Sequence, residues 1–280
     1  MRKKAGSKHV RGVWPWVRRL FLIGFLIWTL FPIYWMLTMS LKPEIDALAY
    51  PPKWIFTPTF DNYRAAFRRS DFVRGFGNSS AIGLATTLFA LLVGAPGAYV
   101  LARFRFPRKE NLEFWILSAK MMPPIVVLIP YFIMFRVLGM LDTMASLVVT
   151  HVILNLPLVI WVLKGFFAEI PTELEEAARV DGCRRWGAFF RIILPLASPG
   201  IAATGILCFL SSWNEMLFAL ILTGSKTKTA PVAIFNFISF EEVLWGPLSA
   251  AGIVAITPVI LFIILVRKQL VRGLTLGAVK

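Results

Sequence analysis

The chain has 280 residues, of which 58% are hydrophobic and only 16% are charged, and its mean hydropathy is +0.71. Soluble domains are about half apolar and about a quarter charged, so this composition excludes a soluble globular protein and indicates a lipid environment. The formal net charge of +15 does not indicate a nucleic-acid-binding protein, because the basic residues lie in short stretches between long apolar runs. The composition predicts an all-α, polytopic membrane protein.

Six apolar stretches are long enough to cross a bilayer, which takes about 20 mainly apolar residues. Backbone groups in lipid must be hydrogen-bonded within the segment, so each stretch is predicted to be a transmembrane helix. The first stretch follows a basic segment, residues 1–19, and is too long for the apolar core of a signal peptide, so we expect it to be retained. The six predicted spans are residues 20–41, 79–102, 112–135, 144–167, 199–222 and 246–266.

The basic residues outside the spans predict the orientation of the protein. Most of them lie on one side, in residues 1–19, 103–109, 164–191 and 267–280. The side richer in lysine and arginine is normally the cytoplasm, so both termini are predicted to be cytoplasmic. The first outer loop, residues 42–78, is the exception, since it carries six basic residues. Within it, the stretch from Asp61 to Arg69 predicts a short amphipathic helix along the membrane surface.

The loop between the fourth and fifth spans, about residues 169–198, contains signals for a short cytoplasmic helix. Thr172 is followed three residues later by Glu175, which is the spacing of a capping box, and Pro171 precedes both. A helix is therefore predicted to start at Thr172. Gly182 supplies a flexible break after it, and a second amphipathic helix, residues 186–193, is expected to end at Pro195.

Three apolar residues, Leu174, Ala177 and Ala178, share one face of the first of these helices by their spacing. Small side chains on that face permit close approach of another protein. The residues alone leave two interpretations open: a stiff elbow that transmits movement into the bundle, or an ordinary helix lying on the bilayer surface.

The same loop contains Glu-Ala-Ala, then a glycine after three residues, then Ile-x-Leu-Pro after nine more. These positions are Glu176, Ala177, Ala178, Gly182, Ile192, Leu194 and Pro195. Their order and spacing resemble the EAA loop of binding-protein-dependent ABC importer permeases. Asp181, before the glycine, is typical of the sugar-importer branch, and the stretches 40–42, 122–124, 213–215 and 270–280 are similar to its MalG-like subunit. The resemblance makes residues 20–280 a six-span permease domain with a cytoplasmic coupling helix.

The resemblance implies that the loop docks on a separate ATPase subunit. The residues expected to couple to it are Glu176, Ala177, Ala178, Asp181, Gly182, Ile192, Leu194 and Pro195. The cytoplasmic tail, residues 267–280, is a second expected contact. The sequence has no G-x-x-x-x-G-K-[ST] segment, so ATP and Mg²⁺ are expected on the partner ATPase, and this chain is expected to bind no cofactor and to be no enzyme.

The resemblance also implies the other partners and the location. The expected partners are a second permease subunit in a heterodimer, two cytoplasmic ATPase subunits, an extracellular or periplasmic solute-binding protein and membrane lipid, without nucleic acid. The expected location is the inner (cytoplasmic) membrane. Sugars, oligosaccharides and polyols all fit as solutes, and the sequence does not distinguish them.

Polar and helix-breaking residues inside the spans are candidates for the translocation path, because such groups are costly in lipid. They are Asn214 and Glu215 in the fifth span and Pro123 and Pro124 in the third. The two prolines predict a kink. The interpretations of Glu215 stay open: it lines the path or holds the partner permease, or it is a hydrogen-bonded packing position near the outer interface. Lys120 lies roughly 12 Å from the inner surface and Glu215 about 24 Å by helix rise, so a direct pair between them is not expected.

Two other functions compete with this interpretation. An ion-coupled secondary transporter needs intramembrane acidic or basic relays, for which only Lys120 and Glu215 qualify, and it leaves the loop elbow unexplained. An integral-membrane enzyme needs clustered His, Asp or Cys residues. The cysteines and histidines are too scattered for a disulfide or a metal site, and a structural or incidental role is expected for Cys183, Cys208, His9 and His151.

Overall fold

The computed structural model describes residues 14–238 and 243–276. In these residues the chain is built from helices, and extended pairing is confined to one bridge between Ile238 and Val243. Residues 1–13 of the predicted basic segment and residues 277–280 of the predicted tail lie outside the described part.

Four continuous helices are long and apolar enough to cross a membrane. They are α1 (Trp14–Leu41), α4 (Ser70–Arg103), α7 (Met144–Glu169) and α14 (Trp245–Leu276). The helix α7 starts at its predicted residue. By contrast, α4 starts at Ser70, well before the predicted residue 79, and α14 continues past residue 266 to Leu276. These long helices therefore extend beyond the apolar stretches that identified them.

The predicted third span is two helices, α5 (Lys109–Met121) and α6 (Pro124–Val137), which meet at 90°. Pro123 and Pro124 have no backbone N–H, and the residue before a proline is driven out of the helical region. Met122 accordingly has an extended backbone with ψ of 128°. The predicted kink is confirmed, and it is a full break between two helices.

The predicted fifth span is also interrupted, contrary to the expectation of one continuous helix from 199 to 222. A bend of 76° at Ala197 separates the short helices before it from α11, and Asn214 to Met216 separate α11 from α12. The elements are α9 (Arg185–Ala188), the π-helix η1 (Phe189–Ile193), α10 (Leu194–Leu196), α11 (Ser198–Trp213) and α12 (Leu217–Leu222). Counting each bent pair as one span gives up to six spans, the predicted number.

Pro195 does not end the preceding helix as predicted, but lies within α10 directly after the π-helix. A proline ring clashes with the carbonyl four residues earlier and donates no hydrogen bond to it. The backbone widens at this point, and the N–H of Leu194 donates to the carbonyl of Phe189, five residues back.

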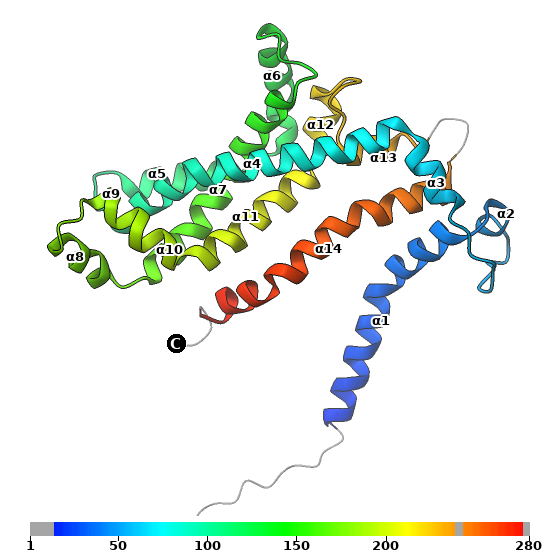
Figure 1. Cartoon of the computed structure of the whole chain (residues 1–280), viewed down its shortest axis with the longest axis horizontal. Helices are drawn as coiled ribbons and strands as arrows, with labels where there is room; N and C mark the ends of the chain where they lie inside the picture. The colour runs from blue at the N-terminus through cyan, green and yellow to red at the C-terminus, as the bar shows by residue number, and fades with distance from the viewer. Residues whose placement is uncertain (1–13, 239–242, 277–280) are drawn as a thin grey trace, which may run out of the picture.

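The helices form a bundle with a loop cluster at each end (Figure 1). The elements α4, α7 and α11 pack together, α8 (Thr172–Val180) lies at one end, and α2 (Glu44–Ala47), α3 (Asp61–Arg68) and α13 (Ala230–Phe235) lie towards the other. The helix predicted after Asp61 is confirmed by α3, and its place along the membrane surface stays a prediction. The helix α1 diverges from the bundle and meets α14 where Met36 contacts Gly252.

Close contact between α4 and α7 depends on a glycine. A Cβ added to Gly94 would lie 2.6 Å from Cγ1 of Val159, a buried and β-branched side chain. Small residues let membrane helices approach closely, where packing rather than the hydrophobic effect holds them together. The glycine therefore sets the distance between the two helices.

We predict that Gly94→Ala lowers the thermal unfolding midpoint of the purified protein relative to Gly165→Ala. Both changes gain about 1 kcal/mol of helix propensity, but nothing lies within 4 Å of a Cβ at Gly165, whereas overpacking at Gly94 costs about 1–3 kcal/mol. Tryptophan fluorescence during heating in detergent measures both midpoints. Equal midpoints for the two variants would contradict the proposed tight contact.

Candidate functional site

The helix α8, in the loop between the fourth and fifth predicted spans, begins at Thr172, as predicted, but without a capping box. Pro171 precedes the helix and no side chain caps its first turn. Glu175 does not reach back along the backbone. Its carboxylate accepts a hydrogen bond from the Tyr99 hydroxyl and lies 3.5 Å from Nε of Arg103. The expected local cap is therefore replaced by an ion pair and a hydrogen bond to α4, since charge-assisted interactions are the stronger ones.

Tyr99 is the centre of the contacts that hold α8 in place. Its ring is buried and lies 4.7 Å from the ring of Phe189 and 6.3 Å from that of Phe167, centroid to centroid. Arg103 also donates to the carbonyl of Ile170 at 2.6 Å, in the connection between α7 and α8. The elbow is thereby fixed to the ends of two long helices.

The face of α8 differs from the prediction in one residue. Leu174 and Ala177 are exposed, but Ala178 is buried against the rest of this chain. Val180 is 87% exposed. The apolar surface available to another protein therefore contains Leu174, Ala177 and Val180, and Ala178 instead packs the helix onto the bundle.

The turn after α8 requires its glycine. Gly182 has φ of +88°, a conformation that side chains with a Cβ rarely adopt, although nothing lies within 4 Å of a Cβ there. Its N–H donates a hydrogen bond to the backbone carbonyl of Arg179 at 3.1 Å, and the N–H of Cys183 donates one to the carbonyl of Ala178 at 2.9 Å. Asp181 is exposed beside it. This reversal fits the C-terminal glycine motif of helices and presents Glu176, Ala177 and Asp181 on the outside.

The second half of the predicted coupling set lies in the bend. Ile192 and Leu194 are half-buried, Leu194 packs against the core of α4, α7 and α11, and Pro195 is exposed. The fully buried member of this segment is Ile193, which the sequence pattern does not single out. These residues shape the elbow and connect it to α11.

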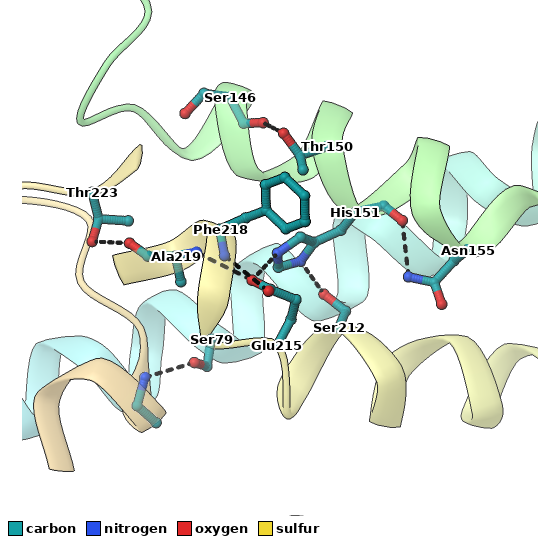
Figure 2. A network of polar contacts seen from close by, with 11 residues as sticks. Ser79, Ser146, Thr150, His151, Asn155, Ser212, Glu215, Phe218, Ala219 and Thr223 are labelled. Atoms are coloured by element: carbon teal, nitrogen blue, oxygen red, sulfur yellow. Dashed lines mark hydrogen bonds and ion pairs between the residues drawn. The ribbon is translucent and has the colours of Figure 1, made fainter. Parts of the chain in front are cut away.

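At the other interruption, Glu215 caps the start of α12 (Figure 2). Its two carboxylate oxygens accept hydrogen bonds from the backbone N–H groups of Phe218 at 2.9 Å and Ala219 at 3.1 Å. A helix start leaves such N–H groups unpaired and favours a negative charge. These hydrogen bonds fit the interpretation of Glu215 as a hydrogen-bonded packing position, and its place on the translocation path stays a prediction.

His151, for which a structural or incidental role was expected, is part of a hydrogen-bonded network that the sequence did not predict. It is 1% exposed, and its ring lies between Ser212 Oγ, 2.7 Å from Nδ1, and Glu215 Oε2, 3.2 Å from Nε2 (Figure 2). An ionised carboxylate only accepts hydrogen bonds, so Nε2 donates to it. The network joins α7, α11 and α12 at the break. A histidine inside an apolar run was the only available signal for it.

The other predicted path residues lie at the two breaks. Asn214 is exposed and its amide donates to the carbonyl of Leu210 at 2.9 Å. Pro123 and Pro124 are exposed where α6 begins. Lys120 donates to the carbonyl of Leu154 at 3.4 Å and does not pair with Glu215, as expected.

The segments beyond the two breaks, α6 and α12, pack on each other. Phe218 and Leu222 share an apolar cluster with Leu128 and Phe135, and the rings of Tyr131 and Phe218 are 5.7 Å apart. The breaks at 122–123 and at 214–216 therefore lead to one common unit, made of α6 and α12.

Asp142 fastens the loop after α12. Its carboxylate accepts hydrogen bonds from the backbone N–H groups of Gly224, Lys226 and Thr227 and from the Thr227 hydroxyl, at 2.7–3.2 Å. Burial opposes ionisation of Asp142, but the hydrogen bonds from Thr227, Gly224 and Lys226 outweigh it and hold the pKa of its carboxyl below the usual range.

Metal and disulfide chemistry find little support in the described residues. Within 14–238 and 243–276 no group of three or more His, Cys, Asp or Glu side chains is placed to hold a metal ion. Cys183 and Cys208 are both free, as expected. His9 lies outside the described residues.

A bundle of up to six spans, two of them broken, with a fixed helical elbow at one end, defines a polytopic membrane transport subunit. Residues 88–275 match the family described as the binding-protein-dependent transport system inner membrane component. This match covers more than half of the chain, and the chain therefore belongs to that family.

Individual relatives agree with the family. The trehalose transport system permease protein SugB of Mycobacterium tuberculosis is 42% identical over 260 residues, which cover 90% of this chain and 93% of that protein. The diacetylchitobiose uptake system permease protein DasC of Streptomyces coelicolor is 33% identical over 270 residues, covering 96% and 97%. The fold matches a crystal structure of a bacterial ABC transporter that imports the acidic polysaccharide alginate, with a TM-score of 0.78, 22% identity and 95% and 99% coverage.

Glu215→Ala is predicted to destabilise the protein by at least about 1–3 kcal/mol, the cost of one buried donor left unsatisfied, because it leaves His151 and two backbone donors without their shared acceptor. The neighbouring Asn214→Ala, at an exposed side chain, is expected to stay within about 0.5 kcal/mol. Chemical unfolding in mixed micelles measures both. In a double-mutant cycle with His151→Ala the two losses should be strongly non-additive, and simple additivity would show that the pair does not interact.

The lowered pKa of the Asp142 carboxyl predicts that acid weakens the attachment of the loop after α12. A carboxylate with a lowered folded-state pKa stabilises the protein fully above its unfolded pKa of about 3.9 and loses this contribution as the pH falls through the folded value. The unfolding midpoint of the native protein should therefore exceed that of Asp142→Asn at pH about 7, and the difference should shrink below pH about 4. A difference that stays constant down to pH about 2.5 would contradict this role.

Proposed function

We propose that this chain is one permease subunit of an ATP-driven importer that moves a sugar or sugar-like solute, such as an oligosaccharide or polyol, across the cytoplasmic membrane. Membership of the binding-protein-dependent family supports the transport role. The relatives named for trehalose and diacetylchitobiose, and the fold shared with an alginate importer, support the solute class. The single observation that carries the coupling role is the fixed elbow with its exposed Ala177 face.

The elbow transmits motion because it is tied to two spans. The contacts of Glu175 with Tyr99 and Arg103 attach α8 to α4, and Ile170 connects it to α7. A partner that moves α8 therefore moves both helices as a rigid body, which is how closure around nucleotide is converted into a change of access. ATP and Mg²⁺ on the separate ATPase supply the chemical energy, and Glu176, Ala177, Asp181 and Gly182 form the receiving surface of this chain.

The proposed assembly contains a second permease subunit, two cytoplasmic ATPase subunits and an outer solute-binding protein. The elbow lies at the end of the molecule that carries Arg103, Arg105 and Arg108, and basic residues favour the cytoplasmic side. This supports cytoplasmic termini. The apolar surface of α1, which is exposed from Trp14 to Tyr34, supports burial against lipid and a second permease.

Ala177→Asp is predicted to abolish ATP-dependent uptake while leaving the protein in the membrane. The new carboxylate would be buried without a partner in the docked surface, which costs more than the docking can supply. Uptake of labelled sugar by proteoliposomes that contain the complete complex measures the effect.

The matched control is Ala177→Ser, which keeps a small side chain at this exposed position and should retain most uptake. Normal uptake by Ala177→Asp would remove the docking role of α8. Uptake driven by an ion gradient in proteoliposomes without the ATPase would instead support a secondary transporter.

A further inference from the structure

A crevice lies between α8 and the turn that connects α4 to α5. It has a volume of about 320 Å³. Its lining residues follow the ends of the apolar spans, since Arg103 is the last residue of α4 and Thr172 the first of α8. The charged residues that line it are Arg103, Arg105, Arg179, Arg185, Glu175 and Glu176.

Positive charge exceeds negative charge in this crevice, and one of the two carboxylates is already engaged. Glu175 is bound by Tyr99 and Arg103, which leaves Glu176 as the acidic group at the rim. The side chain of Arg103 is only 8% exposed and its Nε lies 3.5 Å from the Glu175 carboxylate, so this pair is formed within the chain. Arg105, Arg179 and Arg185 then stand against Glu176 alone, and this excess of positive charge favours an added anion.

The guanidinium groups are suited to one kind of anion. Arg185 lies over the ring of Phe104, 5.0 Å from its centroid, which fixes its position. Arg105 and Arg179 are exposed at the opening. Arginine presents a rigid set of donors that fits a carboxylate with two parallel hydrogen bonds.

We propose that this crevice receives an aspartate or glutamate side chain of the ATPase subunit. The proposal rests on the proposed function and adds a second, oppositely charged contact beside the apolar Ala177 face. The placement favours a protein over a lipid headgroup, because the crevice is built by residues beyond the ends of α4 and α7 and shares α8 with the docking surface. The acidic side chain would pair with Arg179 and Arg105, which are exposed at the opening.

The proposal gives the docking of the ATPase an electrostatic component. Charge complementarity at an interface speeds association and is weakened by salt. The affinity of the ATPase for the permease should therefore fall as the salt concentration rises, and the part of this dependence that the crevice causes should disappear when its charge is reversed.

The test uses the permease heterodimer in nanodiscs and its purified ATPase. The variants are Arg105→Glu with Arg179→Glu, and the neutral pair Arg105→Gln with Arg179→Gln. The control is Arg184→Glu with Arg191→Glu, which reverses two exposed charges of the same loop outside the crevice. The dissociation constant of the ATPase is measured at about 50 mM and about 500 mM KCl.

The reversed pair should raise the dissociation constant at low salt by about tenfold or more and flatten its salt dependence. The neutral pair should show a smaller change of the same sign, with an unchanged unfolding midpoint, and the control should stay within about twofold. Reversal of one acidic residue of the ATPase to lysine should restore binding to the reversed permease.

Three results would overturn the proposal: an equal loss in the control, an unchanged dissociation constant in the reversed pair, or an effect seen only in nanodiscs with anionic lipid. The last would assign the crevice to a lipid headgroup. If Ala177→Asp still uncouples transport while the crevice variants bind normally, the proposed function stands and the crevice contact falls. If neither Ala177→Asp nor the crevice variants weaken binding of the ATPase, the docking role of α8 is wrong as well.

Discussion

The structure depends on satisfying backbone hydrogen bonds at the places where its helices break inside or beside the membrane. Hydrocarbon offers no acceptor or donor, so an interrupted span needs internal partners for every freed group. Prolines solve the problem at Pro123 and Pro124, which have no N–H to satisfy. Glu215 solves it at α12 by accepting two N–H groups with one carboxylate. Once these breaks are stabilised, α6 and α12 can leave the direction of the bundle and pack on each other.

Two carboxylates, one in α8 and one before α12, interact in a similar way. Glu175 and Glu215 each hold a short helix to a long one, and each is accompanied by a basic partner, Arg103 in the first case and His151 in the second. A buried carboxylate without such a partner would be expensive. The two pairs therefore fix the positions of α8 and α12 relative to the long helices. Ala177, which is exposed on α8, takes no part in these contacts.

The sequence predicted those features that depend on nearby residues. The length of the apolar runs identified the spans, the double proline identified the break before α6, and the turn signals identified the start of α8 at Thr172 and the glycine of its C-terminal turn. It failed where distant residues compete for a side chain. Glu175 has the spacing of a capping box, but its partner Tyr99 lies 76 residues away in the chain, and His151 lies 64 residues from Glu215. No local pattern reports such pairs, and so the pairing of His151 with Glu215 and the burial of Ala178 against the bundle were not predicted.

The length of α4 connects the two ends. Its 34 residues extend about 50 Å at the helical rise, considerably more than the bilayer core of about 30 Å. At its start Asp71 pairs with Lys228 in the outer loops, and at its end Arg103 pairs with Glu175 in the elbow. Gly94 lets α7 lie directly against it, and α7 carries His151 to the break before α12. In the proposed function, a displacement of the elbow would therefore pass along two long, closely packed helices to the α6–α12 unit, which lies beyond the breaks at 122–123 and 214–216.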